Sequence, residues 1–327
     1  MWVEVRLVSP SSKPPLERGI ALITAMLVMA LAAIAAAAVL VSAQNSIRRA
    51  GTLIDGERAW WYAQGLESWT RRILARDFEK NGLIDSLDED WARPIDYLPV
   101  EQGAVRGKVE DLQGRFNLNN LGTAAPAKYQ QQLQQLFQNI EGLNPAQAQP
   151  LAEAIKDWID ADQIPTGAGG AEDTDYLGLP QPYRAANQPM GSPSELLAIK
   201  GMTAEIYQRL APYVCTLPIG TARKPTAINV NTASPALLMA LSATVDRGKI
   251  DNFVQKRVKE PAKSVPELQK DGTLPADVTP DLIDVKTQFF LMSTEAFIGS
   301  GRVALYSVIQ RAGSGAPQVI ARSLDTE

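Results

Sequence analysis

The most hydrophobic part of the chain is an uninterrupted apolar run at residues 20–41, where Thr24 is the one polar residue and no residue is charged. A helix rises about 1.5 Å per residue, so roughly 20 such residues cross the hydrocarbon core of a bilayer. The run is apolar on every side, whereas a core helix of a soluble domain carries one apolar stripe. We therefore predict a membrane-spanning helix over 20–41. A cleaved signal peptide ending at Ala43 is a weaker alternative, because its apolar core is usually about 7–15 residues long.

Helical periodicity continues beyond the apolar run. Hydrophobic side chains recur along one helical face at Tyr62, Leu66, Trp69 and Ile73. Asn81-Gly82 is a suitable terminator, so the sequence predicts one helix over 20–82. The aromatic segment AWWYA at 59–63 would pack against the chain's own sheet or present a surface to a partner helix, and the sequence leaves both open.

Basic residues before the apolar run indicate how it crosses the membrane. They are Arg6, Lys13 and Arg18. Basic residues that flank a membrane span stay on the cytoplasmic side. The sequence therefore predicts a single-pass protein. Its N-terminus would lie in the cytoplasm, and the chain after residue 41 would lie on the opposite side of the membrane.

Strand-like segments flank a long helical region. Residues 83–102 predict a loop with a short edge strand, and 106–121 predict a hairpin with its turn at Gln113-Gly114. Three strand-like runs separated by glycine-rich turns end the chain: TQFFLMSTEAFI, GRVALYSVIQRA and PQVIARSLD. Strands on both sides of a helical region favour one sheet, built by 83–121 and 285–327, over two domains in series.

Between these segments, residues 122–284 show helical periodicity. Two apolar stripes mark the first helices, at Tyr129, Leu133, Leu136 and Ile140 and at Leu151, Ile155, Trp158 and Ile159. Further helices are predicted at 193–199, 203–213, 234–242 and 249–259. The expected fold class is therefore α+β, with a long N-terminal helix packed on an antiparallel sheet and a large all-α insertion domain.

Composition narrows the chemistry that this chain can perform. Its 327 residues include no histidine and one cysteine, Cys215, and the net charge is −4. These counts exclude Ser-His-Asp and Cys-His catalysis and histidine metal sites, and no motif supports a carboxylate or lysine enzyme. Cys215 is expected to be a small buried residue, because a lone cysteine forms no internal disulfide. We expect no enzymatic activity.

The acidic segment 157–175 is the strongest candidate for a metal site. It carries six carboxylates, and no Lys or Arg occurs between Asp157 and Arg184. Grouped carboxylates repel one another unless a cation lies among them, and the flexible PTGAGG segment would let the chain fold back. An irregular all-oxygen set suits Ca²⁺, although a solvated acidic loop without metal is the alternative. The candidate ligands are Asp160, Asp162, Glu172, Asp173, Asp175 and, as a further contributor, Asn187.

Two later segments resemble the helix-hairpin-helix units of DNA-binding proteins. They are SPSELLAIKGMTAEIYQRLAPYV at 192–214 and INVNTASPALLMAL at 228–241. Residues 221–270 contain nine Lys or Arg against four Asp or Glu, which suits nucleic acid. However, neither hairpin has the paired glycines that present N–H groups to phosphate. A structural helical bundle without a nucleic-acid partner is favoured, and a membrane-anchored DNA-binding or DNA-uptake protein is the alternative.

The junction ERGIALITAML resembles a type IV prepilin processing site, which is cut after Gly19 so that the mature helix begins at Ile20. The fifth mature residue would be Thr24, where pilins usually have a glutamate. Four more stretches resemble one family: GRFNLNNL, DWIDADQIPTGAGGAEDTDYLGLPQPYRAANQP, SPSELLAIKGM and INVNTAS. Together they make nearly the whole chain similar to the K-type minor pseudopilins of the bacterial type II secretion system, with residues 1–19 as the prepilin leader.

This resemblance implies a function as well as a fold. Members of the family bind calcium in the acidic loop and form a ternary tip complex with the I-type and J-type minor pseudopilins. The chain would be anchored in the bacterial inner membrane with its C-terminal domain in the periplasm. Prepilin peptidase and the major pseudopilin would be further partners, and the secretin and secreted substrates are candidate contacts. The missing glutamate and the bulky insertion would place the chain at the pseudopilus tip, where it initiates or caps assembly for export of folded proteins.

Overall fold

One long N-terminal helix is the largest element of the computed structural model, which describes residues 15–327 apart from 83, 221, 312, 314 and 326–327. Helix α1 spans Pro15–Asn81, close to the predicted 20–82. The side chains of residues 15–19 and 81 are not among those described. The predicted leader at 1–19 therefore lies outside the part of the chain whose side chains the structure describes.

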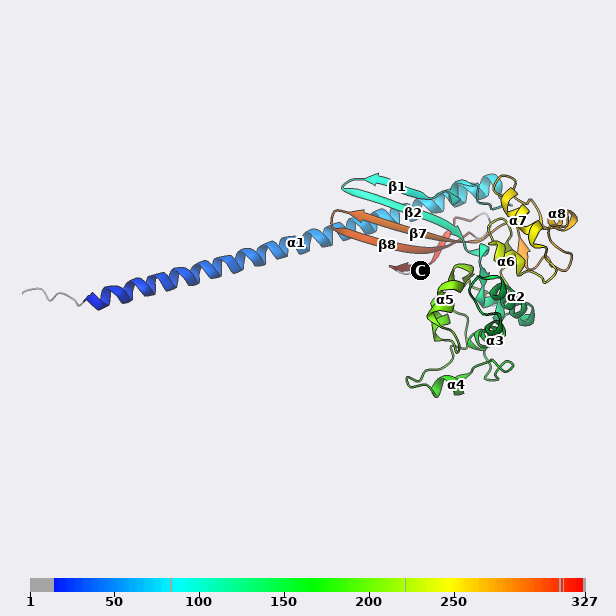
Figure 1. Ribbon diagram of the computed structural model, residues 1–327. Coiled ribbons are helices and arrows are strands. Elements are labelled where there is room, and N and C mark those ends of the chain that lie inside the picture. The colour runs from blue at the N-terminus through cyan, green and yellow to red at the C-terminus, as the bar shows by residue number, and fades with distance from the viewer. Residues whose placement is uncertain (1–14, 83, 221, 312, 314, 326–327) are drawn as a thin grey trace, which may run out of the picture.

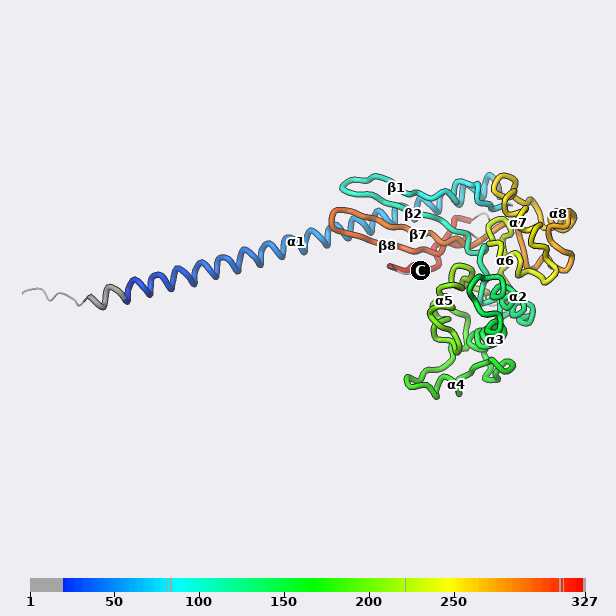
Figure 2. The backbone as a smooth tube through the Cα atoms, viewed as in Figure 1, coloured from blue at the N-terminus to red at the C-terminus, as the bar shows by residue number. Residues whose placement is uncertain are grey.

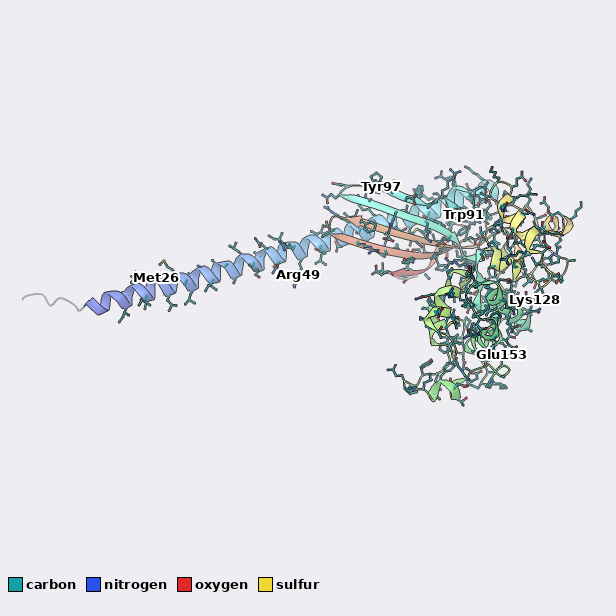
Figure 3. All side chains as sticks on the ribbon, in the orientation of Figure 1. Met26, Arg49, Trp91, Tyr97, Lys128 and Glu153 are labelled. Atoms are coloured by element: carbon teal, nitrogen blue, oxygen red, sulfur yellow. The ribbon has the colours of Figure 1, made fainter. Side chains whose placement is uncertain are left out.

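The first half of α1 packs against no other element in the described residues. All residues from 20 to 54 are exposed, and Figure 3 shows the side chains between Met26 and Arg49 standing away from the body of the protein. Within the described chain, α1 is the one helix that is long and apolar enough to cross a membrane. Because apolar side chains are unfavourable in water, this segment requires a bilayer or other apolar helices around it.

The second half of α1 lies along the sheet. Its buried residues Ala59, Ala63, Leu66 and Leu74 share a core with apolar side chains of the strands. A Cβ atom on Gly107 of the sheet would lie 2.7 Å from Leu66 Cδ2, so this glycine lets the helix approach the sheet without displacing the Leu66 side chain. The expectation that segment 59–63 packs on the chain's own sheet is confirmed for Ala59 and Ala63, whereas Trp61 lies on the opposite, exposed face.

Five antiparallel strands form the sheet in the order β1-β2-β7-β8-β9. They are β1 (Ile95–Val100), β2 (Gly103–Asp111), β7 (Phe289–Ile298), β8 (Gly301–Gln310) and β9 (Gln318–Leu324). Strand β2 pairs directly with β7, with Val105 opposite Ala296. Figure 2 shows the chain leaving the sheet after β2 and returning to it at β7. The predicted α+β class, with a long helix on an antiparallel sheet and a helical insertion, is confirmed.

The predicted hairpin at 106–121 is wrong. Strand β2 ends at Asp111, and its two neighbours are β1 and β7, so its continuation has no place in the sheet. Phe116–Asn117 instead forms β3, which pairs in parallel with β4 (Val214–Cys215). The apolar residues after Gly114 are buried in the core of the insertion and not against the sheet. The insertion consequently begins near Leu112 rather than at 122.

The insertion between β2 and β7 is mainly helical and has one continuous core. Its first part contains η2 (Leu112–Gly114), η3 (Leu118–Gly122), α2 (Pro126–Asn139), η4 (Pro145–Gln147), α3 (Ala148–Ile159) and α4 (Asp173–Leu177). Its second part contains η5 (Pro193–Ala198), α5 (Ala204–Leu210), η6 (Ala211–Tyr213), α6 (Pro235–Met239), α7 (Arg247–Lys256) and α8 (Val265–Lys270). A second short parallel ladder joins β5 (Ile228–Asn229) to β6 (Ile283–Asp284). Helices α4 and α8 were not predicted from the sequence.

A buried polar network ties the insertion to the end of α1. Arg311, which follows β8, donates to Asp77 Oδ2 of α1 at 3.1 Å and to Asp85 Oδ1. The carbonyl oxygen of Asp85 accepts from Asn229 Nδ2 at 3.1 Å, and the same amide donates to Asp111 Oδ2 at 2.8 Å. The insertion is therefore held at the end of the helix that lies opposite the apolar run (Figure 1).

Candidate functional site

Helix α3 is the platform on which the acidic loop is built. Its apolar face carries Leu151, Ile155 and Ile159 in the insertion core. Residues four apart lie on one face of a helix, so Glu153 and Asp157 point to the same side. Both are buried, at the end of the insertion far from the sheet (Figure 3 labels Glu153). Their carboxylates face the loop that follows α3.

The loop folds back because those two carboxylates accept hydrogen bonds from its backbone. Both Asp157 carboxylate oxygens accept from Thr166 N, at 3.1 and 3.0 Å, and Oδ2 also accepts from Ala171 N at 2.9 Å. Glu153 Oε2 accepts from Gly169 N at 2.7 Å. A Cβ atom on Gly170 would lie 2.3 Å from Asp157 Oδ2, so only glycine fits there. The PTGAGG segment thus brings the chain back over α3.

Three carboxylates meet where the loop closes, and we call Asp157, Asp160 and Glu172 the loop cluster. One oxygen from each lies within 4.8 Å of the others. Glu172 is only 1% exposed, yet neither of its carboxylate oxygens has a hydrogen-bond partner among the described residues. Asp160 Oδ1 and Asn187 Oδ1 are likewise buried and without a partner there. Buried acceptors are nearly always satisfied in folded proteins, so these oxygens indicate a missing donor or cation.

The electrostatics of the loop cluster lead to the same conclusion. Burial, reinforced by the negative charge of Asp157 and Asp160, raises the pKa of Glu172 to about 7. Burial also raises the pKa of Asp160, although an ion pair with Lys156 opposes that effect. A carboxylate set of this kind is hard to keep ionised without added positive charge. Its donors are all oxygen atoms, the ligand type that a hard cation such as Ca²⁺ prefers, so the residues fit that ion.

The remaining predicted ligands have other contacts. Asp162 is exposed and its Oδ1 accepts from Ile164 N at 2.9 Å. Asp173 Oδ1 accepts from Ala185 N at 3.0 Å, and Asp175 Oδ1 accepts from Lys200 Nζ at 2.7 Å. The structure therefore brings together Asp160 and Glu172 of the predicted set, with Asp157 as a member that the prediction omitted. The available signal was the position of Asp157 in the last turn of α3, three residues before Asp160, which follows the helix.

The two hairpin segments do not present a phosphate cradle. In the first, Met202 N donates to Ile199 O at 3.0 Å and Lys200 N donates to Tyr176 Oη at 3.4 Å. In the second, Thr244 N donates to Ser242 Oγ at 3.1 Å. The Asp277 carboxylate accepts hydrogen bonds from both the Ser242 and the Thr244 hydroxyl groups. Lys200, Met202 and Thr244 thus use their N–H groups within the chain rather than offering them to phosphate, and an acidic side chain lies beside the second hairpin.

Helix α1 provides the other candidate functional surface. Thr24 lies in its exposed apolar half, and the threonine hydroxyl donates to Ala21 O at 3.0 Å, so it is satisfied within the helix. Processing at Gly19 and Ile20 stays a prediction. Nearer the sheet, α1 exposes two indole rings: Trp61, 67% exposed, lies opposite the buried stripe of the helix, and Trp69, 46% exposed, lies on its flank beside Ile95 and Lys108 of the strands. Exposed indole rings of this kind are typical of surfaces that contact a partner.

Comparison with known proteins identifies the family. A model of type II secretion system (T2SS) protein K matches residues 114–219, and a second model of that description matches 228–286. Type II secretion system protein K of Aeromonas hydrophila is 34% identical, covering 90% of this chain and 93% of its own. Its Pseudomonas aeruginosa counterpart is 35% identical, covering 94% of this chain and 93% of its own.

Structural comparison agrees. One chain in the crystal structure of the GspK-GspI-GspJ complex from the enterotoxigenic Escherichia coli type 2 secretion system matches with a TM-score of 0.73 and 27% identity, covering 85% of this chain and 100% of that chain. The matches take in the helix, the sheet and both parts of the insertion. The chain therefore belongs to the type II secretion system protein K family, the pseudopilins of a bacterial protein-transport machine.

Proposed function

We propose that this chain is the minor pseudopilin at the tip of the type II secretion pseudopilus, where it initiates or caps assembly. The observation that carries the proposal is the place of the insertion, which lies at the end of α1 opposite the apolar run (Figure 1). A further subunit stacked beyond this end would meet the insertion. The Arg311 network supports the proposal because it holds the insertion rigidly in that position.

Position 24 supports the same placement. In pilins the glutamate usually found there neutralises the N-terminal amine of a neighbouring subunit, whereas Thr24 carries no charge and bonds within its own helix. A subunit without that carboxylate needs no neighbour ahead of it. In this proposal prepilin peptidase cuts after Gly19, α1 holds the mature chain in the inner membrane, and the sheet and insertion lie in the periplasm.

We propose the I-type and J-type minor pseudopilins as partners, bound through the exposed face of α1 that carries Trp61, Gly65 and Trp69. The matched E. coli chain was solved in a GspK-GspI-GspJ complex. On this face, the exposed Trp61 and Trp69 flank Gly65, beside which a Cβ atom would meet nothing within 4 Å. Large apolar rings beside a small residue suit close packing of one helix on another. The major pseudopilin would contact the same helix on the side nearer the membrane.

We further propose that the loop cluster binds Ca²⁺. Asp160 and Glu172 would supply their unpartnered oxygens, with Asp157 completing the cluster and Asn187 Oδ1 as a further donor. A bound cation would neutralise the buried charge. The role of these residues is structural, since they hold the loop between Asp160 and Glu172 against α3. No catalytic step is assigned to the chain, which lacks histidine throughout.

Co-purification from detergent-solubilised membranes tests the proposed partners. The full chain with both Trp61→Ala and Trp69→Ala is expected to lose the I-type and J-type pseudopilins, and secretion in a strain lacking its own copy should fall at least about tenfold. Tyr97→Ala is the matched control, because it removes an equally exposed ring, 71% exposed, from edge strand β1. Unchanged co-purification of the double variant would contradict the proposed interface.

Immunogold labelling of sheared pseudopili tests the tip position separately. Label confined to one end of each filament is the expected result, because the insertion would block further stacking. Label spread along the filaments would refute the tip proposal while leaving the helix interface open to its own test.

A further inference from the structure

The loop cluster already contains one positive charge, and it comes from α3 itself. Lys156 Nζ lies 2.6 Å from Asp160 Oδ2 and 2.8 Å from Thr166 Oγ1. The Lys156 and Asp160 side chains are only 18% and 14% exposed, so water screens this ion pair poorly. The ammonium group thus reaches from the helix into the folded loop.

This contact uses one oxygen of Asp160 and leaves the other. Asp160 Oδ1 is buried without a partner among the described residues, as are both Glu172 oxygens. Asp157 is occupied on both oxygens by backbone N–H groups of the loop. Among the three carboxylates, the unpartnered oxygens therefore belong to Asp160 and Glu172, and the contact with Lys156 leaves Asp160 one unpartnered oxygen.

Charge balance gives Lys156 a second effect. Three ionised carboxylates and one ammonium leave two negative charges, which one divalent cation neutralises. Without Lys156 the metal-free loop would hold three close carboxylates with no positive charge beside Asp160 and would resist folding. With it, the loop tolerates the absence of a cation but attracts a cation less strongly, because the ammonium repels any ion placed in the cluster.

We propose that Lys156 is a built-in counter-charge that sets the calcium affinity of the loop cluster: it weakens Ca²⁺ binding and stabilises the metal-free loop. This inference rests on the proposed calcium site. The other nearby cations do not share the role. Lys200 pairs with Asp175 at 2.7 Å and Arg184 pairs with Asp173 at 3.9 Å, and both of these carboxylates lie outside the cluster.

Calorimetric titration of the full chain in detergent with CaCl₂ tests the proposal. Lys156→Met is expected to tighten Ca²⁺ binding about tenfold, since removing one repelling charge at close range is worth about that factor. The same variant should melt several degrees lower in EDTA and recover the wild-type melting temperature in saturating Ca²⁺. Lys156→Arg keeps the charge and should stay close to wild type. Lys200→Met, which removes an ammonium outside the cluster, is the matched control and should not change the affinity.

The outcomes separate the two proposals. Wild-type binding with no gain in Lys156→Met, or a loss, would overturn the counter-charge role and leave the calcium site in place. No Ca²⁺ binding by either protein would overturn both. If Lys156→Met folds only with calcium, the variant can be prepared in calcium and then mixed with excess chelator. Slower release of the metal than in wild type would support the proposal, and equal or faster release would refute it.

Discussion

Among the residues that the structure describes, two carboxylate clusters of similar geometry differ in where their positive charge comes from. In the junction cluster of Asp77, Asp85 and Glu89, as in the loop cluster, one oxygen of each residue lies within 4.8 Å of the others. The guanidinium of Arg311 joins the junction cluster through Asp77 and Asp85, and it is also stacked over Phe290 at 4.9 Å. The loop cluster has Lys156 at its edge and leaves both oxygens of Glu172 unpartnered.

The difference shows how similar acidic groups acquire different functions. A guanidinium is planar and always charged, and that of Arg311 bonds two of the three junction carboxylates in fixed directions. The third, Glu89, accepts hydrogen bonds from Ser86 N and Trp91 Nε1, so each junction carboxylate has a partner within the chain. An ammonium at the edge of a site compensates one charge and leaves room for an ion. The junction therefore acts as a permanent attachment of the insertion, whereas the loop is suited to a soluble cation.

The largest effect should come from breaking the junction. Arg311→Met would leave the buried Asp77 and Asp85 without their counter-charge, and the free energy of unfolding should fall by about 3–5 kcal/mol. Denaturant unfolding of the full chain in detergent measures this loss. Arg302→Met is the control: its ion pair with Glu295 is exposed, so its loss should stay below about 1 kcal/mol. Equal effects of the two substitutions would contradict the comparison.

Calcium should stabilise the loop cluster but not the junction. At about 100 times its dissociation constant, a ligand that binds only the folded state adds about 2.7 kcal/mol, which a thermal melt in Ca²⁺ against EDTA detects. Glu172→Gln should abolish this rise, because it removes the charge of the least satisfied carboxylate. Glu89→Gln, the corresponding change in the junction cluster, should preserve the rise. If both variants lost the calcium response, the cation would not be specific to the loop.

The backbone of the loop should be nearly as sensitive as its charges. Gly170→Ala places a Cβ atom 2.3 Å from Asp157 Oδ2 and 2.5 Å from Thr166 N, so we expect about 2 kcal/mol of destabilisation and weaker calcium binding. Gly178→Ala, whose added Cβ would have its nearest neighbour at 3.7 Å, is the matched control and should be close to neutral. Melting temperatures with and without Ca²⁺ report both effects.

A smaller effect should appear in the pH dependence of the junction. Burial, with the charge of Asp77 and Asp85, raises the pKa of Glu89 from 4.5 to about 7. A carboxyl group raised on folding contributes fully below about pH 4.5 and loses that contribution as the pH rises through about 7. Partial solvation of Glu89 limits the change to about 1 kcal/mol. Unfolding free energies at pH 5 and 8 should therefore differ less in Glu89→Gln than in wild type, whereas exposed Asp96→Asn should leave the difference intact.

Hydrophobic periodicity in the sequence was enough to predict the elements in which that periodicity is strong. The long helix was predicted within a few residues of Pro15–Asn81, and the three terminal strands appear as β7, β8 and β9. The hairpin at 106–121 failed because its alternation is short and its apolar residues found a better site in the insertion core. Periodicity records which side of an element is apolar, but it does not say which of two cores will bury that side.

The acidic loop was predicted from composition, yet its geometry was not. Six carboxylates without a basic residue among them led to the prediction of a cation site, but Asp173 and Asp175 make other contacts and Asp157 takes a place in the cluster. Which carboxylates meet depends on the turn around Gly170 and on backbone hydrogen bonds that sequence spacing does not reveal. The counter-charge from Lys156 was visible in the sequence only as an ordinary helical pair four residues from Asp160.

By itself, the sequence determined an apolar run long enough to cross a membrane, the absence of histidine chemistry, the α+β order of elements and the presence of an acidic loop. These properties depend on composition and on short-range periodicity, and both can be read directly from the amino-acid sequence. The tertiary structure decided the pairing of β2 with β7, the members of the loop cluster and the contact of Arg311 with Asp85, which spans 226 residues. Such contacts follow from the packing of distant segments, because buried charges and apolar faces find their partners only when the whole chain has folded.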